Sequence, residues 1–89
     1  MKQLSLTQIR KAIDDADEIL LRAIAARFAA VAHLKALKKK EGVEIEDKDR
    51  EEELKNLWKK RAEKLNLKPE LALLILDFIL AESKRIQSA

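Results

Sequence analysis

The 89-residue sequence has no cysteine, and it has only one glycine, one proline and one histidine. Without cysteine, the chain has no disulfide framework and no thiolate that could serve as a nucleophile or a metal ligand. The single His33 excludes histidine-rich metal chemistry and leaves no serine–histidine pair for nucleophilic catalysis. Because so few residues favour turns, the composition predicts few and long helices.

Aromatic residues are scarce, and the charges are mixed in sign. The three aromatic residues, Phe28, Trp58 and Phe78, lie within helical patterns that indicate packing. The net charge is only +3, and a basic stretch at 33–40 is followed by a mainly acidic one at 46–53. A nucleic-acid-binding protein presents a face of one sign with aromatic residues interleaved. The sequence therefore argues against a nucleic-acid partner.

Long hydrophobic runs are also lacking. The longest apolar run, 71–81, contains Asp77 and is too short to span a bilayer. The first residues lead directly into a helical pattern, without the apolar core of a signal peptide. The composition, 47% hydrophobic and 39% charged, is typical of a soluble and nearly all-helical chain. We expect one small domain over residues 1–89, located in the cytoplasm and not bound to a membrane.

The first helix, expected over residues 5–40, organises the rest of the chain. Its apolar residues recur in steps of three and four, which places them on one stripe of the helix. The members of this stripe are Ile9, Ile13, Ala16, Leu20, Ile24, Val31 and Leu34. Arg27 and Lys38 continue the stripe, and their separation of eleven residues brings the helix back to within about 20°. Two cations on a face that should be buried indicate the floor of an anion-binding site.

Each of these cations also has an ordinary structural explanation. The stem of Arg27 can lie on apolar surface while its guanidinium reaches water. The run from Lys38 to Lys40 suits the negative end of the helix dipole. Register nevertheless distinguishes Lys38, because Lys39 and Lys40 are rotated by about 120° and 140° from the Arg27 face.

A second helix is expected over residues 47–66, and its inward stripe extends back to Asp47, Arg50 and Glu51. Acidic residues in a first turn commonly serve as caps and as partners of the helix dipole. Asp47 and Glu51 are also i,i+4 neighbours, a geometry in which two acceptors can share one ligand hydroxyl. The sequence leaves both interpretations open.

A third helix is expected over residues 69–87, with Pro69 at its first position. It is apolar nearly all round from 71 to 81, which is typical of a helix buried on most sides. Ser83 and Gln87 continue its apolar line, again four residues apart. Such a polar pair is either a helix end exposed to solvent or part of a site.

The helix lengths predict the assembly. At 1.5 Å per residue the first helix is about 50 Å long, and the other two are about 30 Å each. A dimer in which the long helices pair and the short ones flank them covers the long helix compactly. We therefore expect an all-α fold with three helices per chain, one long and two shorter, in an intertwined six-helix homodimer. Arg10 lies about 100° around the helix from Arg27, so it cannot share the pocket of Arg27 in the same chain, but on paired long helices it can enter the partner's site.

Several motifs of the three expected helices occur in order along the chain. They are L-x-x-I-R at 6–10, D-x-x-D-x-x-L-L at 14–21, Arg27 with Lys38 eleven residues later, D-x-x-R-E at 47–51, and S-x-x-x-Q at 83–87. With these motifs the sequence resembles the all-helical chorismate mutase family over essentially its whole length.

The resemblance implies the [3,3] rearrangement of chorismate to prephenate, a step in phenylalanine and tyrosine biosynthesis, with no covalent intermediate and no cofactor. Such a reaction requires that the flexible enolpyruvyl arm be held in a chair-like geometry. It also requires donors placed in advance around the ether oxygen, where negative charge develops as the bond breaks.

The resemblance also implies the roles of the residues. Arg27, with Arg10 of the partner subunit, clamps the two substrate carboxylates, a bidentate task that suits arginine. Lys38 and Gln87 donate hydrogen bonds to the ether oxygen. These two residues, with Arg27 and Glu51, form the expected catalytic set.

The other expected contacts orient the substrate. Asp47, through its backbone, and Glu51 bind the ring hydroxyl of chorismate. Arg50 and Ser83 support the contacts to the carboxylates. All eight residues are expected to bind the substrate, and none is expected to bind a metal.

Two alternative functions remain open. An isochorismate pyruvate-lyase shares this fold and most of this pocket, so the sequence separates the two activities poorly. A non-catalytic helical dimerisation module is an alternative of another class. Such a module tolerates alanine at Arg27 or Lys38, since buried charges would then only cost stability.

Overall fold

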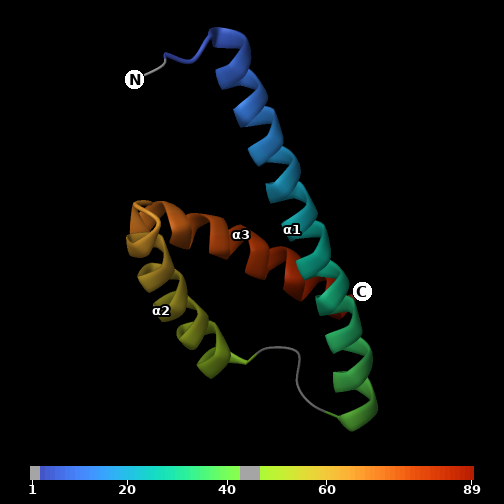
Figure 1. The fold of residues 1–89 in the computed structure, drawn as a ribbon. Coiled ribbons are helices and arrows are strands. Elements are labelled where there is room, and N and C mark those ends of the chain that lie inside the picture. The colour runs from blue at the N-terminus through green and yellow to red at the C-terminus, as the bar shows by residue number, and fades with distance from the viewer. Residues whose placement is uncertain (1–2, 43–46) are drawn as a thin grey trace. The chain divides into compact units, whose positions relative to one another are not determined.

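A computed structural model of the protein describes residues 3–42 and 47–89. The regular secondary structure in these ranges is helical. Its helices are α1 (Leu6–Glu41), α2 (Lys48–Lys64) and α3 (Pro69–Ser88), with 36, 17 and 20 residues (Figure 1). These two ranges contain no strand. The prediction of an all-α chain with three helices, one long and two shorter, is confirmed.

Helix α1 begins with a reciprocal hydrogen-bonded cap. The backbone N–H of Gln8 donates to Ser5 Oγ at 3.1 Å, and the backbone N–H of Ser5 donates to Gln8 Oε1 at 2.8 Å. The cap satisfies two backbone donors that a helix N-terminus otherwise leaves unpaired. At the other end, Gly42 follows the helix with a φ of 73°, a left-handed conformation that glycine adopts without strain.

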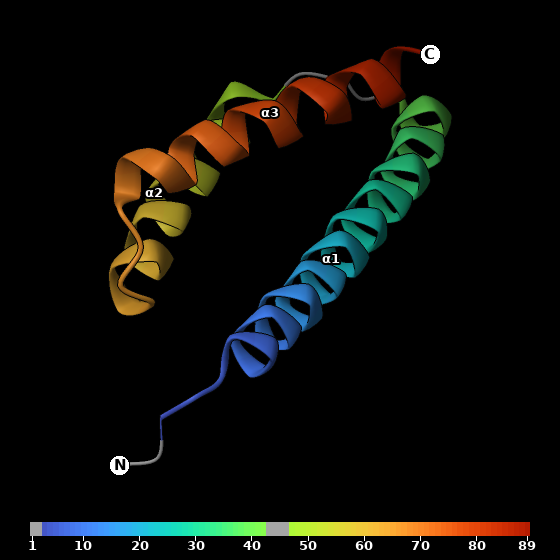
Figure 2. The same cartoon turned by 90° about the horizontal axis from the view of Figure 1, so that it is seen from above.

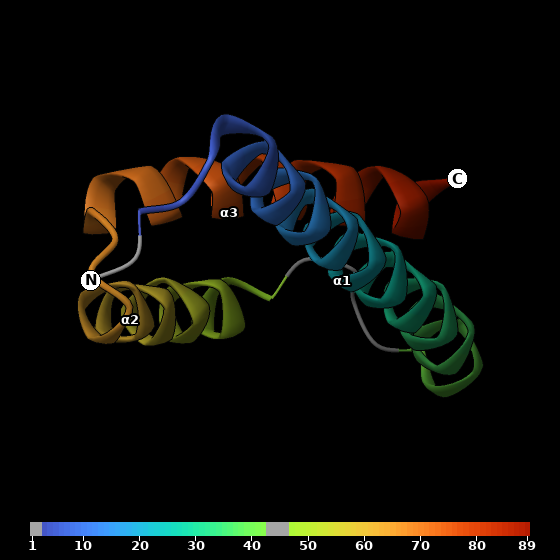
Figure 3. The same ribbon diagram turned by 45° about the horizontal axis from the view of Figure 1, so that its top comes forward.

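Helices α2 and α3 form an antiparallel hairpin around a short turn, as Figure 3 shows. Asn66 has a φ of 58°, and the N–H of Leu67 donates to the carbonyl of Ala62 at 2.9 Å. Asparagine tolerates this left-handed conformation better than most residues do. Pro69 occupies the first turn of α3, where its missing N–H costs nothing. The chain therefore reverses direction within a few residues.

The core of residues 31–89 lies where α2 and α3 pack together, and Figure 2 shows these two helices from a second direction. Its members are Ala62 from α2 and Ala72, Leu76 and Ile79 from α3, and Val31 of α1 is buried as well. Alanines at 62 and 72 let the two helix backbones approach closely near the turn. Leu76 is fully buried, and it is the largest side chain of the described residues to be so.

Two apolar stripes remain exposed in the single chain. On α1, within the unit that ends at Ala30, Ile9, Ile13 and Leu20 are all exposed. On α3 the exposed stripe comprises Leu71, Leu74, Ile75 and Phe78. None of the helices in the described ranges combines the length and apolar character needed to cross a membrane. The expectation that the α1 stripe is buried is met at Val31 and is not met at Ile9, Ile13, Leu20 and Leu34, which are exposed in one chain.

Candidate active site

The first candidate residues lie on α1, in the unit that ends at Ala30. Arg10 is exposed, whereas Arg27 is half-buried. Ile24 and Phe28, which lie within one turn of Arg27, are half-buried as well. Partial burial strengthens the attraction of a guanidinium for a carboxylate, because less water screens the charges.

Lys38 is set apart from its neighbours by burial. It is half-buried, while Lys39 and Lys40 are exposed. One turn earlier, Lys35 is also half-buried and its ammonium donates to the Ala89 carbonyl. Within the unit formed by residues 31–89, the contact made by Lys35 therefore joins α1 to the last residue of the chain.

At the start of α2, Asp47 and Arg50 make local contacts. Asp47 is the N-cap, and its Oδ1 accepts from the backbone N–H of Arg50 at 3.0 Å. The guanidinium of Arg50 donates from Nη1 to Glu53 Oε1 at 2.6 Å, and Arg50 is exposed. The cap therefore holds the Asp47 side chain at the start of α2, and the contact with Glu53 holds Arg50 on the exposed side of this turn.

Glu51 differs from these two residues because it reaches the other helix of the hairpin. Its side chain is 20% exposed, and its Oε1 lies 2.7 Å from Nζ of Lys84 on α3. Lys84 is the neighbour of Ser83 and lies three residues before Gln87. The structure therefore brings Glu51 to the turns of α3 that carry two other candidate residues.

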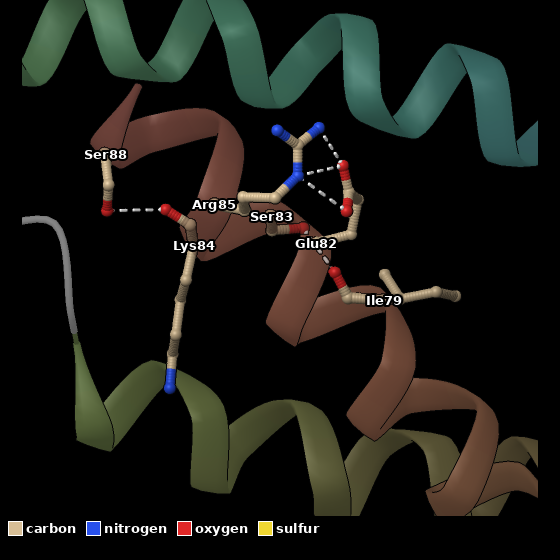
Figure 4. A network of polar contacts seen from close by, with 6 residues as sticks. All are labelled: Ile79, Glu82, Ser83, Lys84, Arg85 and Ser88. Carbon is tan, nitrogen blue, oxygen red and sulfur yellow. Dashed lines mark hydrogen bonds and ion pairs between the residues drawn. The ribbon is translucent and has the colours of Figure 1, made fainter.

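The two α3 candidates are buried to different degrees. Ser83 is 5% exposed, and its hydroxyl donates to the Ile79 carbonyl at 2.7 Å (Figure 4). Gln87 is half-buried, and its Nε2 donates to the Ser83 carbonyl at a long 3.4 Å. Among the described residues no group donates to its buried Oε1. A buried amide oxygen left without a donor is costly, and the partner it lacks is a hydrogen-bond donor.

A second polar cluster lies on the exposed side of α3. Arg85 donates from Nε to both carboxylate oxygens of Glu82, at 2.8 and 3.0 Å (Figure 4). This hydrogen bonding lowers the pKa of Glu82 and raises the pKa of Arg85. The pair is a surface ion pair within one helix, so it contributes little to stability. It does not involve any of the predicted site residues.

The sequence was compared with models of known protein families. The sequence profile of the family described as chorismate mutase type II matches residues 9–88. That range includes every predicted site residue from Arg10 to Gln87 and nearly all of the three helices. The chain belongs to the chorismate mutase type II family. Comparisons with curated proteins and with solved structures gave no match.

Membership of the chorismate mutase family confirms the resemblance seen in the sequence and supports chorismate mutase activity in general. The candidate groups of this family member are cations, a carboxylate, a hydroxyl and an amide, which suit an anionic substrate that bears a hydroxyl. Within the described ranges no three histidine, cysteine or acidic side chains are grouped so as to hold a metal ion.

Sequence reasoning missed Lys84. The signal that could have found it is the symmetry of the hairpin. Glu51 precedes the turn at 65–68 by fourteen positions, and Lys84 follows that turn by sixteen. Residues at similar distances from a tight turn lie at similar heights along two antiparallel helices, so opposite charges at these positions are candidates for an ion pair.

Proposed function

We propose that this member of the chorismate mutase type II family converts chorismate to prephenate by a [3,3] rearrangement, without a covalent intermediate. The observation that carries the proposal is the family match over residues 9–88, which covers every candidate residue. Prephenate is the product expected for a step toward phenylalanine and tyrosine. The enzyme's task is to hold the reacting arm near its attack geometry and to stabilise charge on the ether oxygen.

Arg27 and Lys38 supply the cationic side of the proposed site. Arg27 binds a substrate carboxylate through its two parallel N–H groups, and Lys38 donates to the ether oxygen. The half-burial of each cation supports these roles, because a donor shielded from water stabilises developing charge more strongly. Their separation of eleven residues on one helix keeps both on one face.

Gln87 is the second proposed donor to the ether oxygen. Its Nε2 donates a long hydrogen bond, 3.4 Å, to the Ser83 carbonyl, so a substrate oxygen can replace that acceptor at little cost. Ser83 supports a carboxylate contact once its hydroxyl rotates away from the Ile79 carbonyl. A buried hydroxyl and amide side by side give the site directional hydrogen bonds that an apolar wall lacks.

The ring hydroxyl of chorismate is bound from the start of α2. Glu51 accepts a hydrogen bond from this hydroxyl, and Asp47 contributes its backbone while its side chain caps the helix. Arg50 strengthens the carboxylate contacts after exchanging Glu53 for the substrate. These residues orient the ring rather than acting on the bonds that form and break.

The proposed enzyme is an intertwined homodimer. The apolar stripe of α1, which includes Ile9, Ile13 and Leu20, is exposed in a single chain and needs a partner surface. A second copy supplies the same stripe, so pairing two long helices covers both at once. In this dimer the exposed Arg10 enters the partner's site, where it clamps the second substrate carboxylate.

One experiment separates this function from its alternatives. The purified protein is mixed with chorismate, and the loss of the diene absorbance is followed, with prephenate identified as the product. The assay is then repeated with isochorismate. Turnover of chorismate to prephenate supports the mutase, whereas pyruvate release from isochorismate alone identifies a lyase. Inactivity on both substrates favours the non-catalytic helical module.

A further inference from the structure

Glu51 and Lys84 form an ion pair that joins α2 to α3. Nζ of Lys84 lies 2.7 Å from Oε1 of Glu51, and the two side chains are 42% and 20% exposed. In Figure 4 the side chain of Lys84 extends from α3 toward the ribbon of α2. The pair therefore fixes the Glu51 carboxylate against a helix other than its own.

This pair differs in kind from the ion pairs formed within single helices. Lys11 and Asp15, for example, are 76% and 61% exposed and lie one turn apart on α1. Such surface pairs contribute little, because water screens them and both side chains lose freedom. A less exposed pair between two helices is screened less, and it holds the carboxylate against the neighbouring helix.

The pair leaves Glu51 able to bind a ligand. A carboxylate has about four lone-pair positions on its two oxygens, and the contact with Lys84 is made to Oε1. The second oxygen can still accept a hydrogen bond from a hydroxyl. An acceptor that is already oriented loses less conformational entropy when the ligand arrives.

We propose that Lys84 is a positioning residue that holds the Glu51 carboxylate in the orientation in which it accepts the ring hydroxyl of the substrate. The inference rests on the proposed function, since it assigns a partner to a residue of that site. Lys84 acts through Glu51 and does not touch the reacting atoms. Because the ring hydroxyl contact exists in both the bound substrate and the transition state, its loss weakens binding more than turnover.

The first test measures steady-state kinetics on chorismate for Lys84→Met, which removes the charge and keeps much of the side-chain length. We expect KM to rise about tenfold, the scale of one charge-assisted hydrogen bond, with kcat changed less than about threefold. Lys84→Arg should restore KM to within about threefold of the original, because it keeps a cation at this position. The control is Lys60→Met, the same change at an exposed position of α2, which should leave both constants unchanged.

The second test repeats Lys84→Met in a Glu51→Ala background. If Lys84 acts through Glu51, the second substitution raises KM by less than about twofold once the carboxylate is absent. Full additivity of the two effects on KM overturns the positioning role and indicates that Lys84 contacts the substrate itself. A fall in kcat with unchanged KM, together with a lower melting temperature, indicates a purely structural role.

The outcomes also separate this inference from the proposed function. If the unchanged protein converts chorismate and Lys84→Met leaves KM unaltered, only the role of Lys84 is overturned. If the unchanged protein fails to convert chorismate, the proposed function is wrong, and the positioning role of Lys84 is then wrong as well. Circular dichroism melts of every variant establish that the comparison is made between folded proteins. Should Lys84→Met fail to fold, Lys84→Gln provides the same loss of charge with a polar end.

Discussion

At the scale of single residues, Lys38 is half-buried while Lys39 and Lys40, with the same side chain, are exposed. Register around one helix explains the difference, because only Lys38 returns to the face of Arg27. Shielding from water makes this ammonium a stronger donor to a developing negative charge than its two neighbours are.

Replacing Lys38 tests that assignment. Lys38→Ala should lower kcat by about two to three orders of magnitude, the scale for removing one donor that stabilises transition-state charge. Folding should survive, as checked by circular dichroism. Lys39→Ala is the matched control and should retain nearly full activity. A loss smaller than tenfold for Lys38→Ala would reassign the ether-oxygen donor to another lysine.

Gln87 offers a pH-dependent test of the second donor. Gln87→Glu replaces an amide that donates at every pH with a carboxyl that donates only when it is protonated. Activity of the variant should therefore rise as the pH falls toward the pKa of the new carboxyl, while the original enzyme does not show this rise. Rate measurements between about pH 4 and 8 provide the profile, because they run from the ordinary pKa of a glutamate to values that burial can raise it to. A flat profile for the variant places Gln87 outside the site.

At the scale of helices, the hairpin of α2 and α3 depends on close packing around Leu76, which is fully buried. The two alanines near the turn, Ala62 and Ala72, allow the approach that buries it. The same packing sets the distance between Glu51 and Lys84, so the stability of the hairpin and the geometry of the candidate site are linked.

Truncating Leu76 measures this packing. Leu76→Ala should lower the free energy of unfolding by about 2–5 kcal/mol, because it removes buried methyl groups and leaves a cavity. Denaturant unfolding monitored by the fluorescence of Trp58, the single tryptophan, gives the value. Leu65→Ala, at a leucine that is 70% exposed, is the control and should cost about 0.5 kcal/mol or less. Equal losses for both variants would contradict the assignment of Leu76 to the core.

At the scale of the whole molecule, the proposed dimer makes each site depend on two chains. Arg10 is exposed on its own helix and about 100° from Arg27, and we propose that it serves the pocket of the partner subunit. Two different inactive variants can then complement each other in one dimer.

The complementation experiment uses Arg10→Ala and Lys38→Ala. Each homodimer should be nearly inactive, and unfolding and refolding the two together should make half of the dimers mixed. In a mixed dimer one pocket holds both intact residues and the other lacks both, so roughly a quarter of the original activity should return. Native mass spectrometry confirms the heterodimers. Heterodimers without recovered activity would contradict the shared site, because every pocket would then carry one lesion.

The sequence by itself determined the helical class and the face on which Arg27 and Lys38 lie. Both follow from local periodicity, since 3.6 residues per turn relate positions within one helix whatever surrounds it. The family could also be identified from the sequence, because its motifs occur at fixed spacings along the chain.

The tertiary structure alone decided which residues meet across helices. The pairing of Glu51 with Lys84 depends on how α2 packs on α3, which no single-helix period specifies. For Ser83 the period gave the face of the helix, and only the tertiary structure decided that this end of the face is buried. Arg50 is a residue whose position was predicted wrongly from the period of its helix. Its register predicts an inward position, yet it lies exposed beside Glu53, because an accessible ion pair at the helix start satisfies it without desolvation.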